Sequence, residues 1–223
     1  MSVLDVDNLT VAIRSNGQGT PHGRVQAVRG VSFAIDAGET LAIVGESGCG
    51  KTMTALAVMG LLPDAAEMHG AITLENRRID RLDTRARNRL RGSRIGMVFQ
   101  NPMSSLNPTM RVGEQIAEVL VTHRGLGWDA AHQRAITLLD RMQVRDAAAR
   151  ARQYPFEFSG GMLQRTMIAM SLACSPEVLI ADEPTTALDV TIQAQILLLL
   201  RDLQETQGLS IILITHDLGV VAR

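Results

Sequence analysis

A glycine-rich segment constrains the fold of this chain more than any other feature of its sequence. Residues 45–52 read GESGCGKT, and they lie between the short apolar run 40–44 and helix-forming residues 53–59. This is the pattern G-x-x-x-x-G-K-[ST] between a strand and a helix, where backbone amides at a helix N-terminus bind phosphate. A chance glycine-rich turn would not also supply the strand, the lysine and the hydroxyl. The segment therefore predicts a phosphate-binding loop in an α/β fold.

The loop contains the only lysine of the chain. Of the 22 basic residues, Lys51 is lysine and all others are arginine. Codon bias is one explanation, but a lysine kept at this position favours a need for a compact ammonium that a planar guanidinium does not replace. We expect Lys51 to bind the β- and γ-phosphates of a nucleotide and the Thr52 hydroxyl to bind Mg²⁺. The other predicted phosphate contacts are Gly45, Glu46, Ser47, Gly48, Cys49 and Gly50.

Two further apolar strands end in polar residues that suit such a site. Residues 178–181 precede Asp182 and Glu183, and residues 210–215 precede His216. Because ligands bind at the carboxyl ends of parallel strands, we expect these side chains to lie beside the loop. Asp182 is expected to hold Mg²⁺, and Glu183, on the opposite face of an extended chain, to polarise an attacking water molecule. A lone histidine after a strand is usually structural, but the shared location favours a functional role for His216.

A second potential anion site lies between these strands in the sequence. Ser159, Gly160 and Gly161 come just before a helical pattern at residues 166–174. A serine N-cap followed by two glycines leaves backbone amides free for an anion, although it is also the ordinary start of a capped helix. A helix dipole contributes only about 0.3–1 kcal/mol at an exposed end. This site therefore becomes useful when it meets a nucleotide that the first loop already holds.

Composition and charge exclude several other classes. The 223 residues are 46% hydrophobic and 20% charged, which is typical of a folded domain rather than a disordered chain. The net charge of −1 does not favour a polyanion as partner, and two cysteines are too few for a disulfide framework. No apolar stretch approaches the roughly 20 residues of a membrane-spanning helix. Residues 77–94 hold eight arginines without interleaved aromatics, which favours a solvated basic face over a nucleic-acid site.

The order of these motifs resembles that of the ATP-binding-cassette (ABC) ATPases. The resemblance covers essentially the whole chain, and the Ser-Gly-Gly signature separates this family from other phosphate-loop enzymes. The matching segments are residues 45–52, Gln100 after residues 95–99, residues 159–161, residues 180–184, residues 187–189 and His216.

The resemblance implies a head-to-tail dimer that encloses two ATP molecules, with an identical or a paralogous ATPase subunit as partner. Each ATP would lie between Lys51 and Thr52 of one subunit and the signature residues 159–161 of the other. The resemblance also implies a role for each remaining site residue. Gln100 would contact Mg²⁺ and the attacking water and link to a membrane partner, Asp182 would support Mg²⁺, Glu183 would act as general base, His216 would sense the γ-phosphate, and Asp189 would shape the dimer seam.

The family's fold is an α/β phosphate-loop NTPase core, mainly a parallel sheet with flanking helices, with an N-terminal antiparallel β part and an inserted α-helical subdomain. Residues 1–100 and 171–223 are expected to form the nucleotide-binding core, and residues 101–170 the helical signature subdomain. Family members continue further, so the core is expected to be truncated at its C-terminal end. The loop at residues 15–23 lacks the aromatic residue that usually stacks on adenine, and His22 is the nearest substitute, which leaves ATP and GTP both open.

Within the family, two segments resemble the bacterial importers of peptides, opines and nickel. They are residues 101–108 and residues 184–196. Residues 191–197 are similar to dipeptide and oligopeptide members, whereas residues 154–157 and 162–165 are closer to nickel members. Uptake of short peptides is the preferred interpretation, and nickel or metal-opine uptake is the alternative.

Such a subunit would work with two transmembrane permease subunits and, indirectly, with a periplasmic or lipoprotein substrate-binding protein. It would lie peripherally at the cytoplasmic face of the bacterial inner membrane and bind no nucleic acid. The alternative from another class is a soluble ABC ATPase that acts on nucleic acid or ribosomes. Such proteins usually carry two cassettes or long coiled insertions, and neither is evident in these 223 residues.

Overall fold

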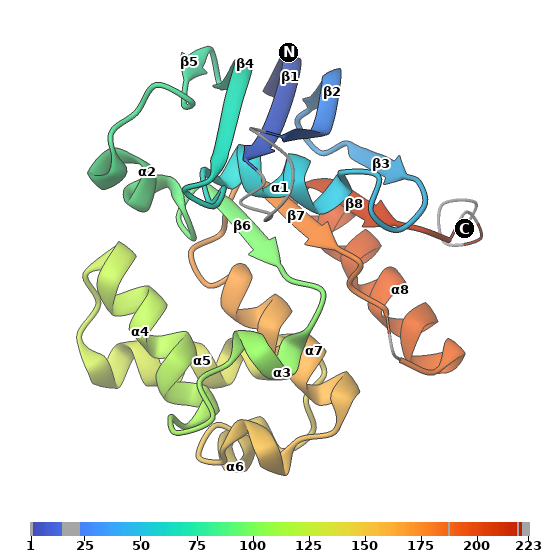
Figure 1. Cartoon of the computed structure of the whole chain (residues 1–223). Coiled ribbons are helices and arrows are strands. Elements are labelled where there is room, and N and C mark those ends of the chain that lie inside the picture. The colour runs from blue at the N-terminus through green and yellow to red at the C-terminus, as the bar shows by residue number, and fades with distance from the viewer. Residues whose placement is uncertain (1, 15–22, 187, 218, 220–223) are drawn as a thin grey trace.

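Two four-stranded sheets organise the chain. The structure is a computed structural model that describes residues 2–14, 23–186, 188–217 and 219. The two sheets lie one above the other, with α1 (Lys51–Met59) between them and most other helices below the second sheet (Figure 1). His22, the expected substitute for a base-stacking aromatic, lies outside the described residues, as does Ala187.

The first sheet is antiparallel, and its first two strands are 13 residues long each. The pairing of its first two strands continues to the register pair Arg14 and Arg24. Two like charges face each other there, and Glu67 on the next strand pairs with both. In spatial order the strands are β2 (Arg24–Asp36), β1 (Ser2–Arg14), β4 (Ala66–Leu74) and β5 (Arg77–Arg78).

The second sheet is parallel, and its strands agree closely with the apolar runs of the sequence. All four strands run in the same direction, so their carboxyl ends meet at one edge. The loop at residues 45–52, Gln100, Asp182 and His216 each follow or end one of these strands. In spatial order they are β3 (Thr40–Val44), β8 (Ser210–Thr215), β7 (Val178–Asp182) and β6 (Ile95–Val98).

Helices cover the parallel sheet and fill the segment between β6 and β7. Residues 99–177, all of which the structure describes, contain helices and no strand. Across the described ranges, each helix is too short or too polar to cross a bilayer. After α1 the helices are α2 (Thr84–Leu90), α3 (Pro102–Ser105), α4 (Val112–Arg124), α5 (Trp128–Arg141), α6 (Ala147–Arg150), the 3₁₀ helix η1 (Pro155–Glu157), α7 (Gly160–Ser171) and α8 (Val190–Gln207).

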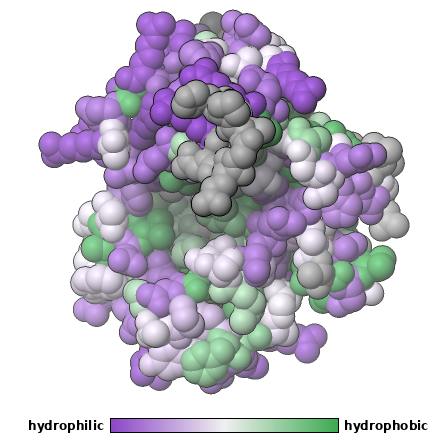
Figure 2. All heavy atoms as spheres, viewed as in Figure 1, coloured by the Kyte–Doolittle hydropathy of each residue, from purple (hydrophilic) through white to green (hydrophobic). Residues whose placement is uncertain are grey.

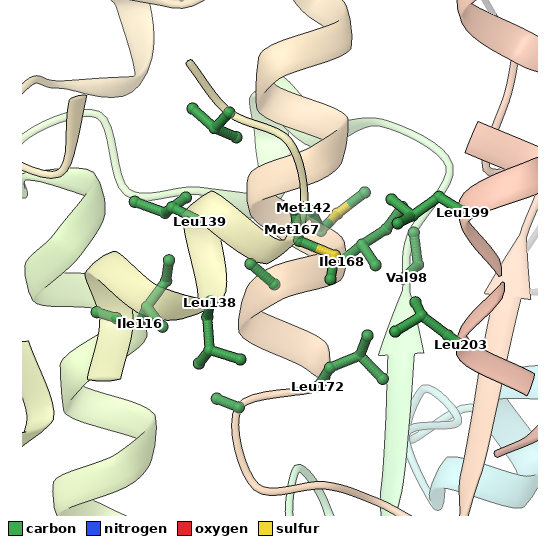
Figure 3. Packing of buried hydrophobic residues seen from close by; sticks show 14 of the residues in the cluster. Val98, Ile116, Leu138, Leu139, Met142, Met167, Ile168, Leu172, Leu199 and Leu203 are labelled. Carbon is green, nitrogen blue, oxygen red and sulfur yellow. The ribbon is translucent and has the colours of Figure 1, made fainter. Parts of the chain in front are cut away.

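Three strands of the parallel sheet, β6, β7 and β8, are buried on both faces, whereas β3 is partly exposed. Successive residues of the buried strands alternate between two hydrophobic clusters, so that Ile180 and Ile212 face α1 and the antiparallel sheet, whereas Leu179 and Leu213 face the helices on the other side. Figure 3 shows the helix-side cluster, in which Met167 of α7 packs as an ordinary core residue. Burial on both faces explains why β7 and β8 are continuous apolar runs rather than alternating ones.

The arginine-rich segment 77–94 is only partly a solvated face. Four of its eight arginines bond to carbonyl or carboxylate oxygens of the chain, and that part of the prediction is wrong. Arg91 donates from Nε to the Met59 carbonyl at the end of α1, at 2.8 Å, where a helix favours positive charge. The other bonded arginines are Arg78, Arg87 and Arg94. The exposed ones are Arg77, Arg81, Arg85 and Arg89, on a side of the molecule that is predominantly hydrophilic (Figure 2).

One of these pairs makes stability depend on pH. Asp80 accepts two hydrogen bonds from Arg78, at 2.7 and 2.6 Å, and one from the Ile72 amide at 3.1 Å. The hydrogen bonds from Arg78 lower the pKa of Asp80 from 3.8 to about 2. Because the folded-state pKa lies below the unfolded one, this stabilisation is fully present above pH ~4 and is lost as the pH falls toward 2.

We expect Asp80→Asn to lower the free energy of unfolding by about 1–2 kcal/mol at pH 7, allowing for solvent screening at the partly exposed Arg78. The difference from the wild type should shrink as the pH falls from 4 toward 2. Urea unfolding at pH 7 and pH 3 measures both values. An equal difference at the two pH values would contradict this account of the pair.

Candidate functional site

The loop after β3 has the backbone shape that its glycines permit. Gly48 and Gly50 have φ angles of 82° and 99°, in the left-handed region that side chains disfavour. A Cβ atom at Gly50 would lie 2.3 Å from the Ala27 carbonyl oxygen, so β2 packs directly against the loop. No side chain caps the N-terminus of α1, which leaves the first amides of the helix free for an anion. The structure thus places residues 45–52 where phosphate binding is expected.

The Lys51 side chain lies inside this loop. It is 7% exposed, and its Nζ donates hydrogen bonds to the carbonyl oxygens of Gly45 at 2.7 Å and Glu46 at 2.9 Å. Nζ also lies 3.9 Å from Oε1 of Glu183. A compact ammonium with three rotatable donors suits three acceptors that lie in different directions.

A cavity of about 1080 Å³ opens above the loop. Loop residues 47–52 line one part of it, β2 lines a wall, and Gln100 and Glu183 reach it from the ends of β6 and β7. The wall on β2 includes Val25, which is 60% exposed although it is aliphatic. A polar end at the loop and an apolar wall match the phosphates and the base of a nucleotide.

Asp182 and Thr52 supply oxygen atoms that fit a magnesium ion. Asp182 is 2% exposed, a hydrogen bond joins it to Thr52, and its Oδ1 is buried without a hydrogen-bond partner. Burial raises the pKa of Asp182, and the hydrogen bond to Thr52 opposes that effect. A buried carboxylate oxygen beside a hydroxyl suits Mg²⁺, which prefers oxygen ligands and shares its remaining positions with phosphate and water. Within the part of the chain that the structure describes, no group of three or more His, Cys, Asp or Glu residues could hold a metal ion.

Glu183 lies at the centre of the remaining polar side chains. Its Oε2 accepts hydrogen bonds from Gln100 Nε2 at 3.0 Å and from Thr186 Oγ1 at 2.9 Å, and His216 Nδ1 lies 3.2 Å from the same oxygen. With Lys51 these residues form what we call the Glu183 cluster. The structure therefore brings together Lys51, Gln100, Glu183 and His216, which the sequence predicted as parts of one site. Gln100 contacts Glu183, and its predicted contact with Mg²⁺ stays a prediction.

The backbone at Glu183 differs from the prediction. The sequence suggested an extended chain with Asp182 and Glu183 on opposite faces, but β7 ends at Asp182 and Glu183 has a φ angle of 47°. The Glu183 amide donates to the Ile214 carbonyl of β8 at 2.9 Å, which holds this left-handed turn. Such a conformation costs energy in a residue other than glycine and recurs at functional sites. The turn, rather than strand alternation, sets the position of the carboxylate.

Thr186 is the cluster residue that the sequence analysis missed. Its amide donates to the Glu183 carbonyl at 3.2 Å, so the two residues close a turn in which the hydroxyl returns to the carboxylate. A hydroxyl residue three positions after an acidic residue, with Pro184 between them, was the available signal.

The signature residues lie apart from the cavity. Ser159 caps α7 as predicted, with its Oγ accepting from the Met162 amide at 3.4 Å, and Ser159 and Gly160 are exposed. A Cβ atom at Gly161 would lie 3.0 Å from Ile192, so this glycine lets α7 approach α8 closely. None of the residues 159–161 lines the cavity above the loop. The two predicted anion-binding elements therefore do not meet within one copy of the chain.

Asp189 has a local structural role in the structure. It is exposed and caps α8, with its Oδ1 accepting a hydrogen bond from the Ile192 amide at 2.9 Å. Its expected position at a dimer seam stays a prediction.

The buried carboxylate of Asp182 is expected to lower the stability of the protein and to contribute to Mg²⁺ binding. We expect Asp182→Asn to raise the free energy of unfolding without nucleotide by about 1 kcal/mol, because the cost of burying the carboxylate disappears. The same substitution should abolish the strengthening of nucleotide binding by Mg²⁺. Urea unfolding and nucleotide titration with and without Mg²⁺ measure the two effects. Mg²⁺ dependence that survives in the variant would remove Asp182 from the ion site.

The fold and the loop together are those of a phosphate-loop NTPase. Residues 28–186 match the family described as ABC transporter. The chain belongs to this family, and the resemblance drawn from its motifs is confirmed.

Relatives with similar sequences carry the names of peptide transport proteins. The dipeptide transport ATP-binding protein DppD of Bacillus subtilis is 51% identical over 223 residues, which cover 99% of this chain and 65% of the relative. The oligopeptide transport ATP-binding protein OppD of Salmonella typhimurium is 52% identical over 220 residues, which cover 99% of this chain and 64% of the relative. The chain thus spans slightly less than two thirds of the length of these relatives.

Solved structures of ABC cassettes share the fold. A dimeric structure of the ATP-binding cassette MJ0796, described as a post-hydrolysis state bound to ADP and Pi, has a TM-score of 0.84 and 29% identity and covers 97% of this chain and 89% of that chain. The structure of cbiO1 from Clostridium perfringens, described as part of the ABC transporter complex cbiONQ, has a TM-score of 0.77 and 31% identity and covers 99% of this chain and 80% of that chain. The predicted fold class is confirmed.

Proposed function

We propose that the chain binds and hydrolyses ATP with Mg²⁺ as the ATP-binding subunit of an importer of short peptides. The observation that carries the proposal is the position of the Glu183 carboxylate, which borders the cavity above the phosphate-binding loop and lies 3.9 Å from the Lys51 ammonium. A carboxylate beside the phosphate-binding lysine is suited to accept a proton from water that attacks a phosphoryl group.

The residues of the site divide the chemistry among them. Lys51 and the loop amides bind the β- and γ-phosphates, and Lys51 exchanges its bonds to the Gly45 and Glu46 carbonyls for phosphate oxygens. Thr52 and Asp182 would hold Mg²⁺, which would neutralise negative charge on the phosphate oxygens. Glu183 accepts the proton of the attacking water. His216 and Gln100 orient the γ-phosphate.

Two copies, or one copy and a paralogous subunit, complete each site. The exposed Ser159 and Gly160 at the start of α7 meet the nucleotide held by the loop of the other subunit. This arrangement is supported by the separation of residues 159–161 from the cavity of their own chain and by the dimeric form described for MJ0796. Because each half-site is incomplete, ATP binding favours the closed dimer over the open one, which is how binding energy drives motion.

The names of the relatives support a class of transported substrate. DppD and OppD are named for dipeptide and oligopeptide transport, which supports peptides over nickel or metal-opines. The subunit would lie peripherally at the cytoplasmic face of the inner membrane, where Gln100 links the site to two permease subunits. A substrate-binding protein outside that membrane would deliver the peptide.

Removing the proposed base tests the chemistry. We expect Glu183→Gln to reduce ATP hydrolysis by at least about 100-fold while ATP binding persists, because an amide accepts no proton from water. Glu205→Gln is the matched control, since Glu205 is an exposed residue of α8 whose side chain pairs with Arg201. Release of phosphate and equilibrium binding of ATP are the two measurements. Hydrolysis by Glu183→Gln at the wild-type rate would refute the role of Glu183.

Mixing two inactive variants tests the shared site. Lys51→Ala removes the loop lysine, and Ser159→Arg blocks the signature, so neither homodimer should hydrolyse ATP. An equal mixture should regain roughly a quarter of the wild-type rate, because half of the dimers contain one intact composite site. A mixture as inactive as its components, with wild-type protein active in the same assay, would argue against the head-to-tail site.

A further inference from the structure

The two carboxylate oxygens of Glu183 have different surroundings. Oε2 accepts hydrogen bonds from Gln100 and Thr186 and has His216 Nδ1 at 3.2 Å. Oε1 lies on the side of the phosphate-binding loop, 3.9 Å from Lys51 Nζ. One oxygen is therefore occupied by donors, whereas the other faces the position of the phosphates.

The donors to Oε2 differ in how they are held. Gln100 follows β6 and His216 follows β8, and both are exposed side chains that reach Glu183 from other strands. Thr186 belongs to the same turn as Glu183, and its amide donates to the Glu183 carbonyl at 3.2 Å. The contact from Thr186 consequently does not depend on the relative position of separate strand ends.

The turn that carries Thr186 is held at two points. At its start, the Glu183 amide donates to the Ile214 carbonyl at 2.9 Å. At the residue before Thr186, Gln193 Nε2 on α8 donates to the Thr185 carbonyl at 3.1 Å. A hydroxyl on this fixed turn can hold a neighbouring side chain in one rotamer at little further entropic cost.

We propose that Thr186 is a positioning residue for hydrolysis, which holds Oε2 of Glu183 so that Oε1 stays directed at the attacking water. The inference rests on the proposed function, because it assigns Thr186 a part in the work of the general base. Gln100 and His216 are then free to leave Oε2 when nucleotide or a membrane partner engages them, and the carboxylate keeps its orientation through Thr186. The Thr186 hydroxyl bonds to Glu183 and not to the loop or Lys51, so its effect belongs to the chemical step rather than to ATP binding.

The test compares variants that differ in the hydroxyl. Thr186→Val and Thr186→Ala remove it, and Thr186→Ser keeps it without the methyl group. Thr185→Val is the matched control, because it makes the same change at the adjacent buried position, where the contact to Gln193 comes from the backbone carbonyl. We expect the first two variants to lower kcat about tenfold with KM for ATP within about twofold of the wild type. Thr186→Ser and Thr185→Val should stay within about twofold of the wild-type kcat.

Three outcomes would overturn the inference. One is a wild-type kcat in Thr186→Val and Thr186→Ala. Another is a loss in Thr186→Ser equal to that in Thr186→Val, which would assign the effect to the methyl group. The third is a rise in KM in proportion to the fall in kcat, or loss of ATP binding in both variants, which would mark a structural role.

The same assays separate this inference from the proposed function. If the wild type hydrolyses ATP and Glu183→Gln does not, a normal kcat without the Thr186 hydroxyl defeats the inference alone. If the wild type hydrolyses no ATP at any protein concentration, or if Glu183→Gln is fully active, the proposed function fails and the inference fails with it.

Discussion

Parallel pairing of β3, β8, β7 and β6 is the constraint on which the site depends. Because these strands run in one direction, the phosphate-binding loop, Gln100, Asp182 and His216 all emerge at a single edge although they are more than a hundred residues apart at the extremes. Two hydrophobic clusters bury both faces of β6, β7 and β8 and hold this edge in place. The polar groups are thus positioned by the core rather than by flexible connections.

The sequence predicted best those strands that a continuous apolar run indicates. The apolar runs 40–44 and 210–215 became β3 and β8 with the same bounds. Sequence patterns failed where tertiary contacts decide. β2 extends through polar residues because β1 and Glu67 support it, and several arginines of segment 77–94 bond to carbonyls or carboxylates that come together only in the fold.

The same distinction applies to the site. Short motifs identified the loop and the acidic pair, because phosphate and magnesium chemistry restrict the residue types at fixed spacings. The left-handed turn at Glu183 and the contact from Thr186 depend on backbone geometry, and local propensity does not favour them. Conformations that local propensity disfavours are expected at functional sites, where they cost stability. The buried carboxylate of Asp182 is a second group in this site whose placement costs stability.

The bonds of Lys51 to the loop carbonyls have a consequence for ligand choice. The Lys51 ammonium donates to the Gly45 and Glu46 carbonyl oxygens, so an anion would compete with these internal acceptors for its hydrogen bonds. A single orthophosphate offers few contacts to offset that loss and the remaining desolvation. A triphosphate would engage the lysine, the loop amides and the helix terminus simultaneously, and this chelate advantage would favour it over small anions.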